Sequence, residues 1–140
     1  MTVQSAIGRA TGWQRWENAA IAVGILVTVI VLNQPWWVLL VAFLAFDLSA
    51  LGYLVNQRIG AAMYNLVHNY TAPALLVVGW AALQLAGTDA AWLVLLASCW
   101  GFHVAVDRAV GFGLKLDSFH HTHLGAIGKS SPLRDQSAAA

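Results

Sequence analysis

The sequence predicts an all-α membrane protein, a four-transmembrane-helix bundle made of two helical hairpins with N- and C-termini cytoplasmic. Three observations support this fold class. The 140 residues are 59% hydrophobic and only 9% charged, against about 25% charged in an ordinary soluble domain. Four apolar stretches fill most of the length, and every Lys and Arg falls on one side of them. This composition excludes a disordered chain, a basic nucleic-acid-binding module and a conventional soluble enzyme.

Each apolar stretch is long enough to cross a bilayer, because a membrane helix needs about 20 residues. Lipid tolerates no unpaired backbone groups, so each stretch is expected to be helical. We predict spans at about residues 16–32, 36–55, 62–86 and 90–110, separated by short polar breaks at 33–35, 56–60 and 87–89. Short connections make successive helices antiparallel neighbours. We expect one domain over residues 1–128, followed by a flexible cytoplasmic tail at 129–140.

The basic residues predict the orientation, since segments rich in Lys and Arg remain in the cytoplasm. The first and third breaks contain no basic residue, and tryptophans lie near several span ends, as interfacial aromatics do. We therefore expect a multi-pass protein of the bacterial cytoplasmic (inner) membrane, with membrane lipid as its partner and no nucleic acid. The seven basic residues are Arg9, Arg15, Arg58, Arg108, Lys115, Lys129 and Arg134.

Ionisable side chains inside a membrane span are costly, so each is a candidate functional group. Asp47 lies in the second span, His68 in the third, and His103 and Asp107 in the fourth, while Glu17 opens the first. At a rise of about 1.5 Å per residue, all five fall in the cytoplasmic half of the bundle. Their shared depth predicts one polar pocket in the bundle core.

Histidines beside carboxylates in this region favour a metal site. His103 and Asp107 are four residues apart and share one helix face, an arrangement typical of metal sites or of a histidine held by an acid. His120, His121 and His123 follow the fourth span. That cluster either folds back over the pocket or forms a solvated loop. The predicted metal ligands are Glu17, Asp47, His68, His103 and His123.

Each of these residues also has a purely structural interpretation. Glu17 is an acid at a helix N-terminus, where the helix dipole favours it. Asp47 is able to pair with Arg58, Arg108 or a tyrosine hydroxyl for packing alone. A single histidine in a span is more often a structural hydrogen-bonding group than a ligand, and Arg108 is equally interpreted as a snorkelling anchor.

Four segments resemble the family called domain of unknown function 4260, which consists of small bacterial proteins expected to be integral to the membrane. The segments are residues 46–53 (FDLSALGY), 60–68 (GAAMYNLVH), 107–115 (DRAVGFGLK) and 122–125 (THLG). The resemblance extends from about residue 16 to 128 and implies no established activity. His103, His120 and His121 match the pattern less securely. The residues that it places at motif positions are Glu17, Asp47, His68, Asp107, Arg108, Lys115 and His123.

The preferred functional hypothesis is a metal-dependent, hydrolase-like membrane enzyme that acts on a lipid-like substrate. Mixed imidazole and carboxylate ligands suit a divalent ion such as Zn, Mn or Fe, which would activate water. The catalytic candidates are Asp107, Arg108 and Lys115, with either cation holding an anionic head group. The sequence contains no nucleophile motif and no glycine-rich phosphate loop.

Three alternatives stay open at this point. Intramembrane acids and histidines also form proton relays, which would make the chain a transporter or a proton-coupled carrier subunit acting as a homo-oligomer. His68 and His103 would serve as axial ligands of a haem. The protein is otherwise a non-catalytic membrane scaffold.

Overall fold

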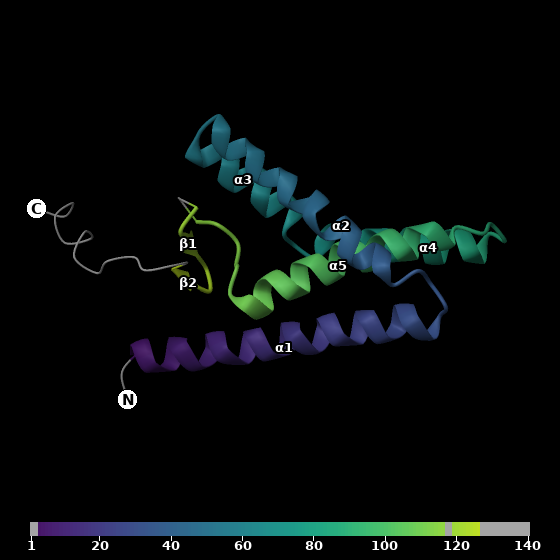
Figure 1. Cartoon of the computed structure of the whole chain (residues 1–140), viewed down its shortest axis with the longest axis horizontal. Helices are drawn as coiled ribbons and strands as arrows, with labels where there is room; N and C mark the ends of the chain where they lie inside the picture. The colour runs from purple at the N-terminus through teal and green to yellow at the C-terminus, as the bar shows by residue number, and fades with distance from the viewer. Residues whose placement is uncertain (1–2, 117–118, 127–140) are drawn as a thin grey trace, which may run out of the picture.

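The computed structural model describes residues 3–116 and 119–126, and five helices dominate them. Helix α1 (Val3–Val31) is followed by α2 (Trp37–Asp47), which continues directly as the 3-10 helix η1 (Leu48–Leu54). Helices α3 (Gln57–Val67) and α4 (Thr71–Leu85) come next, and α5 (Ala91–Val110) completes the helical part. A small antiparallel ladder of β1 (His121–Thr122) and β2 (Gly125–Ala126) follows α5 (Figure 1).

The predicted four-helix membrane fold is confirmed. Four helical stretches are long and apolar enough to cross a bilayer, at Gly8–Val31, Trp37–Leu54, Gln57–Leu85 and Ala91–Val110. The first helix begins at Val3 rather than near residue 16, because residues 3–15 contain no proline and continue the helix in polar sequence. The predicted second break is also shorter, since Asn56 accepts a hydrogen bond from the backbone N–H of Ile59 and thereby caps α3.

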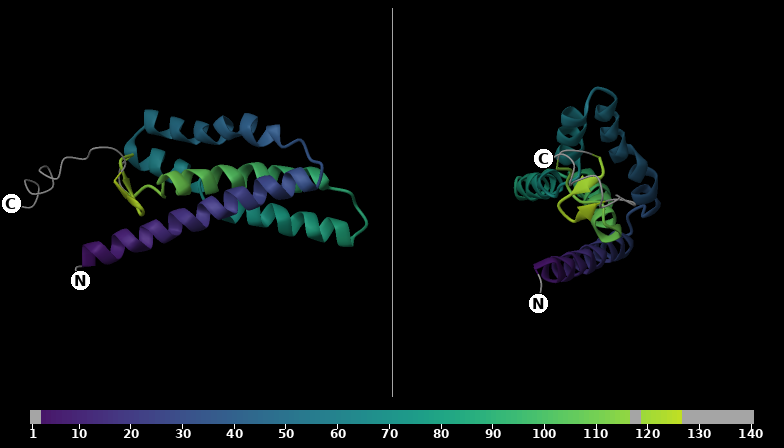
Figure 2. Two further views of the ribbon diagram at one scale, coloured as in Figure 1. Left: turned by 60° about the horizontal axis from the view of Figure 1, so that its bottom comes forward. Right: turned by 90° about the vertical axis from the view of Figure 1, so that its left-hand side faces the viewer.

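One end of the molecule gathers the start of α1, the η1–α3 connection and the β1–β2 ladder, and the connections 32–36 and 86–90 lie at the opposite end (Figures 1 and 2). All basic residues in the described part of the chain lie on elements at the first end. This distribution agrees with the charge pattern of the sequence, and its assignment to the cytoplasm remains a prediction. Lys129, Arg134 and the predicted tail at 129–140 lie outside the described residues.

Helix α5 runs through the middle of the arrangement and packs against α1, α2 and α4 (Figure 2). Its contact face combines small and aromatic side chains, with Ala105 fully buried and Phe102 nearly so. Lipid is as apolar as leucine, so helices associate in a membrane through close packing and polar contacts rather than through the hydrophobic effect. The polar side chains described below therefore also hold the bundle together.

A close approach of η1 to α3 brings the end of α2 beside α3. A Cβ atom at Gly52 would lie 3.2 Å from the Cα atom of Gly60, and a Cβ at Gly60 would lie 2.3 Å from the Tyr53 ring. Glycine is required at both positions because no side chain fits between the two helices. This contact fixes Asp47, the last residue of α2, relative to the side chains of α3.

The third predicted span is broken at residues 68–70, between α3 and α4. The side chain of Asn69 caps both helices. Its Nδ2 donates to the carbonyls of Asn65 (2.7 Å) and Leu66 (2.9 Å), and its Oδ1 accepts from the N–H of Thr71 (2.8 Å). The break therefore leaves few unpaired backbone groups in the membrane, and it places His68 at the point where the chain turns.

Candidate metal centre

Two aspartates and two histidines from three segments of the chain converge beside α5. Asp47 ends α2, His68 caps α3, and His103 and Asp107 lie one turn apart on α5. One potential ligand atom from each lies within 4.8 Å of all the others. The sequence predicted a shared depth for these four residues, and the structure places them in contact.

The spacing of the donor atoms resembles the edges of a coordination tetrahedron. The Nε2 atoms of His68 and His103 are 2.9 Å apart. Each Nε2 lies 3.7 Å from Oδ1 of Asp47, and their distances to Oδ2 of Asp107 are 3.4 and 3.9 Å. In a tetrahedral site with bonds of about 2.0–2.2 Å, neighbouring donor atoms lie about 3.3–3.6 Å apart. The four residues thus fit a single ion with little rearrangement.

Burial makes this cluster costly in the absence of a cation. The exposed fractions of His68 and His103 are 3% and 0%, and the Asp107 side chain is 12% exposed. The cluster contains two carboxylates, those of Asp47 and Asp107, and no Lys or Arg in the described residues forms an ion pair with either. A divalent cation would neutralise both charges and use all four donors.

The hydrogen bonds of His68 orient its free nitrogen toward the cluster. Its Nδ1 lies 2.9 Å from the carbonyl oxygen of Tyr64. A carbonyl oxygen only accepts, so Nδ1 carries the proton and Nε2 of the neutral ring presents a lone pair. Stacking on the Tyr64 ring, at 3.6 Å between centroids and 9° between planes, further restricts the imidazole. A histidine that ligates a metal through Nε2 has this arrangement.

The other imidazole, His103, is held by aromatic packing. The rings of Phe43 and Phe46 lie 4.4 and 5.4 Å from its centroid. Its Nδ1 atom is buried without a hydrogen-bond partner in the described residues, whereas its Nε2 lies in direct contact with His68. A haem bound between His68 and His103 would need its porphyrin plane between the two rings, and this contact leaves no such space. The geometry favours an ion over haem.

Tyr64 also supports Asp107, because its hydroxyl donates to Oδ2 of that carboxylate at 2.9 Å. Groups that orient metal ligands in this way tune both their direction and their basicity. The sequence analysis missed Tyr64. Its position four residues before His68 in a helix is the signal that could have found it, because residues at that spacing share a face.

A cavity of about 480 Å³ opens beside the cluster, within the range of about 300–1,000 Å³ typical of small-molecule sites. Asp47, whose side chain is 47% exposed, contributes the outermost ligand to its wall. The remaining wall is mostly apolar. Its lining residues include Phe43, Asp47, Tyr64, Asp107, Phe112, Lys115 and Phe119.

Lys115 places a buried cation in the wall of this cavity. It is 3% exposed, and its Nζ lies 4.6 Å from the Tyr64 ring and 4.2 Å from the Phe119 ring. Nζ also donates to the Phe119 carbonyl at 3.0 Å. Asn65 fixes its backbone, accepting from the Lys115 N–H at 2.6 Å and donating to its carbonyl at 2.8 Å. Burial lowers the pKa of the Lys115 ammonium, and the nearby Asp107 carboxylate opposes part of that shift.

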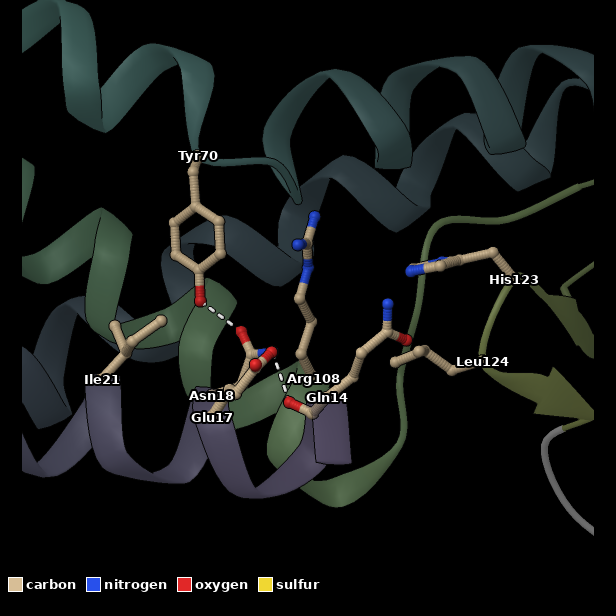
Figure 3. Close-up of a pocket in the computed structure, with 8 residues that line it drawn as sticks. All are labelled: Gln14, Glu17, Asn18, Ile21, Tyr70, Arg108, His123 and Leu124. Carbon is tan, nitrogen blue, oxygen red and sulfur yellow. Dashed lines mark hydrogen bonds between the residues drawn. The ribbon is translucent and has the colours of Figure 1, made fainter. Parts of the chain in front are cut away.

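The other predicted site residues lie elsewhere. Glu17, Arg108 and His123 line a second pocket of about 210 Å³, which shares no lining residue with the first among the described residues (Figure 3). His120 and His121 are exposed, at the turn before β1 and within β1. The structure therefore groups Asp107 with Asp47, His68 and His103, and it separates Glu17 and His123 from them.

The sequence model described as Domain of unknown function (DUF4260) matches residues 11–127, most of the chain. The chain belongs to this family. The matched range of the DUF4260 family includes the four clustered residues, the cavity and the second pocket. No curated protein and no solved structure matches the chain. The family assignment supplies no chemistry, so the function rests on the site itself.

Proposed function

We propose that this DUF4260 protein is a metal-dependent membrane enzyme that hydrolyses a lipid-like substrate. The observation that carries the proposal is the group Asp47, His68, His103 and Asp107, whose donor atoms lie within 4.8 Å of one another beside a cavity of substrate size. Perturbed, buried ionisable groups at the wall of a cavity are the usual composition of a catalytic site.

A divalent Zn, Mn or Fe ion bound by the four residues would need a further coordination position for a water molecule, whose pKa it would lower. The same ion would polarise an ester or phosphoester oxygen. The two histidines form the buried side of the cluster, and both Asp47 and Asp107 line the cavity. Tyr64 holds both Asp107 and His68 in position.

The cavity wall supports a substrate that is apolar over most of its length and anionic at one point. The rings of Phe43, Phe112 and Phe119 provide an apolar surface. Lys115 is the single cation in this wall among the described residues. Apolar surroundings strengthen the attraction between its ammonium and an anion. Arg108 lies in the second pocket, so the role of holding an anionic group next to the cluster falls to Lys115.

Elemental analysis of the purified protein tests the metal centre. We expect about one divalent ion per chain in the wild type and in a control, His120→Gln, which removes an exposed imidazole outside the cluster. We expect none in Asp47→Asn combined with His68→Ala. Absence of metal from the wild type, or equal metal in the double variant and the control, would overturn the metal centre.

Hydrolysis of fluorogenic lipid esters and phosphodiesters in mixed micelles tests the activity. We expect turnover that a chelator abolishes and that added metal restores, with a large loss in Lys115→Met at unchanged metal content. Turnover that survives chelation, or a metal-loaded protein that cleaves neither ester class, would contradict the hydrolase assignment.

We also propose that the basic end of the bundle faces the cytoplasm of a bacterial inner membrane. The described basic residues all lie on elements at that end, which supports this orientation by the positive-inside rule. Reporter fusions at residue 1 and within 86–90 test it. The fusion at residue 1 should report a cytoplasmic location and the other an external one, and the reverse pattern would contradict the proposal.

A further inference from the structure

The second pocket shares no lining residue with the cavity beside the metal centre, and it is formed by α1, the start of α4, the end of α5 and the segment after α5 (Figure 3). Its volume of about 210 Å³ is several times that of a water molecule in the liquid, about 30 Å³. It therefore has room for a polar head group. Its lining residues are Gln14, Glu17, Asn18, Ile21, Tyr70, Arg108, His123 and Leu124.

Arg108 is the unsatisfied group of this pocket. Its guanidinium lies over the Tyr70 ring at 4.8 Å from the centroid, and its Nε is buried without a hydrogen-bond partner in the described residues. No described carboxylate comes close enough to form an ion pair with it. A guanidinium has five N–H donors arranged to match the oxygens of a phosphate or carboxylate. Leaving the buried Nε–H unpaired is costly unless a ligand supplies the acceptor.

His123 adds a second donor. Its Nδ1 accepts a hydrogen bond from the backbone N–H of Leu114 at 2.8 Å, so the proton of the neutral ring is on Nε2. Figure 3 shows the imidazole pointing from the loop toward Arg108. Burial, together with the charge of Arg108, lowers the pKa of His123, although the Leu114 backbone opposes part of the shift. The neutral ring with its Nε2–H is therefore the form present at neutral pH.

The wall opposite these donors is already hydrogen-bonded. Asn18, 7% exposed, accepts from the Tyr70 hydroxyl at 2.5 Å and donates to the Gln14 carbonyl at 2.7 Å (Figure 3). Glu17 lies exposed beside it and forms no ion pair in the described part of the chain. The pocket thus presents the Arg108 guanidinium and the His123 Nε2–H on one side and the Glu17 carboxylate on the other.

The surroundings place this pocket at the level of lipid head groups. Trp13 and Trp16, on the same part of α1, are 72% and 75% exposed, and exposed tryptophans near span ends mark the membrane–water interface. The pocket also lies at the end of the bundle that carries the basic residues. A phosphate at this depth is supplied by the bilayer itself.

We infer that this pocket binds the phosphate of a zwitterionic phospholipid head group, with Arg108 and His123 donating to the phosphate oxygens and Glu17 facing the ammonium. Inorganic phosphate shares part of this chemistry but lacks the group that would pair with Glu17. The inference does not depend on the metal centre, because the two sites have no lining residue in common among the described residues.

Binding of glycerophosphoethanolamine and of inorganic phosphate to the full-length protein in detergent, followed by ³¹P NMR titration, tests this inference. We expect the zwitterionic compound to bind more tightly than phosphate and its affinity to fall about tenfold or more in Arg108→Gln, since charge-assisted bonds of this kind are each worth about 1.5–3 kcal/mol. Arg58→Gln is the matched control, as it removes an exposed arginine at the same end of the bundle.

Two further variants separate loss of binding from loss of folding. His123→Gln alters a loop side chain and should weaken binding several-fold, and Glu17→Gln should weaken binding of the zwitterionic compound but not of phosphate. Thermal melts of all variants in the same detergent should be similar. Equal affinity of Arg108→Gln and Arg58→Gln, or no binding of either compound to the wild type, would overturn the site. Equal or tighter binding of phosphate would overturn its assignment to a lipid head group.

Discussion

The two pockets of this protein lie on different faces of α5 and differ in the charge that they present. Asp107 and Arg108 are consecutive, yet Asp107 joins two histidines and a second carboxylate. Arg108 instead lies over the Tyr70 ring and lines the same pocket as His123. Successive residues of a helix point about 100° apart, so one turn of α5 is able to provide an anionic site for a cation and a cationic site for an anion. The comparison shows that shared depth in the membrane does not imply a shared site.

Neutralising Asp107 and Arg108 one at a time tests whether the two pockets are independent, and it should give the largest effects. Asp107→Asn should lower metal affinity by more than about a hundredfold, because loss of a direct ligand should exceed the roughly 10–100-fold cost of losing a supporting group. It should leave binding of glycerophosphoethanolamine nearly unchanged. Arg108→Gln should have the reverse pattern. Metal titration and ³¹P titration of both variants measure this, and parallel losses in both assays would show that the pockets are one unit.

The hydroxyl of Tyr64 is expected to support Asp107 as a metal ligand. Tyr64→Phe removes the hydroxyl that donates to Asp107 but keeps the ring stacked on His68, so metal affinity should fall about 10–100-fold. Tyr53→Phe is the matched control, because the Tyr53 hydroxyl is buried without a hydrogen-bond partner in the described residues. Competition with a chromophoric chelator measures both affinities. Equal affinities in the two variants would remove Tyr64 from the support of the centre.

Both pockets depend on how the chain leaves α5. Gly111 ends this helix with φ of +106°, a conformation that costs another residue about 1–2 kcal/mol. Gly111→Ala should therefore lower the melting temperature by a few degrees, while Gly24→Ala, in the interior of α1 with open space around its Cβ position, should not lower it. Thermal unfolding in detergent compares them, and an unchanged Gly111→Ala protein would argue against this strain.

The smallest expected effect is the pH response of the second pocket. His123 contacts the Leu114 N–H and faces Arg108 from α5 and Glu17 from α1. Because its folded pKa is lowered, the folded state binds fewer protons than the unfolded state below about pH 6.5, the ordinary histidine value. Its contribution to stability is full above that pH and decreases as the pH falls toward the lowered pKa.

Hydrogen exchange of the Leu114 amide measures this response. After correction for intrinsic rates, exchange should be faster at pH 5.5 than at pH 7.5 in the wild type. In His123→Gln this difference should disappear. A response that persists in the variant would assign it to another group.

Much of the fold follows directly from the sequence. Long apolar runs require helices in lipid, and the short breaks at 33–35 and 87–89 make the chain turn back. Helix α4 packs on its successor α5 as expected, whereas α1 packs mainly on α5 rather than on α2. The apolar run continues through the break at 68–70, so hydropathy alone does not locate it. The side chain of Asn69 caps both helices there. Hydropathy does not detect such a cap.

The sequence predicted the depth of the site residues in the membrane but not which way their side chains face. The helical rise of about 1.5 Å per residue places four residues at a similar depth: Asp47, His68, His103 and Asp107. The structure brings their donor atoms within 4.8 Å of one another. The same estimate also included Glu17, since it contains no information on which way a helix faces. His123 was added as a loop residue able to fold back over the pocket, and the sequence does not show how that loop folds. The separation of Asp107 from Arg108 required the packing of α5 against α1 on one side and α2 on the other.

X-ray absorption spectroscopy of the purified, metal-loaded protein tests the central claim most directly, because it reports the ligands of the ion. We expect two imidazole ligands and further oxygen donors at about 2.0–2.2 Å in the wild type, and a spectrum with fewer imidazoles in His103→Ala. Spectra that are identical in the two proteins, or a wild-type ion with no imidazole ligand, would contradict a centre formed by Asp47, His68, His103 and Asp107.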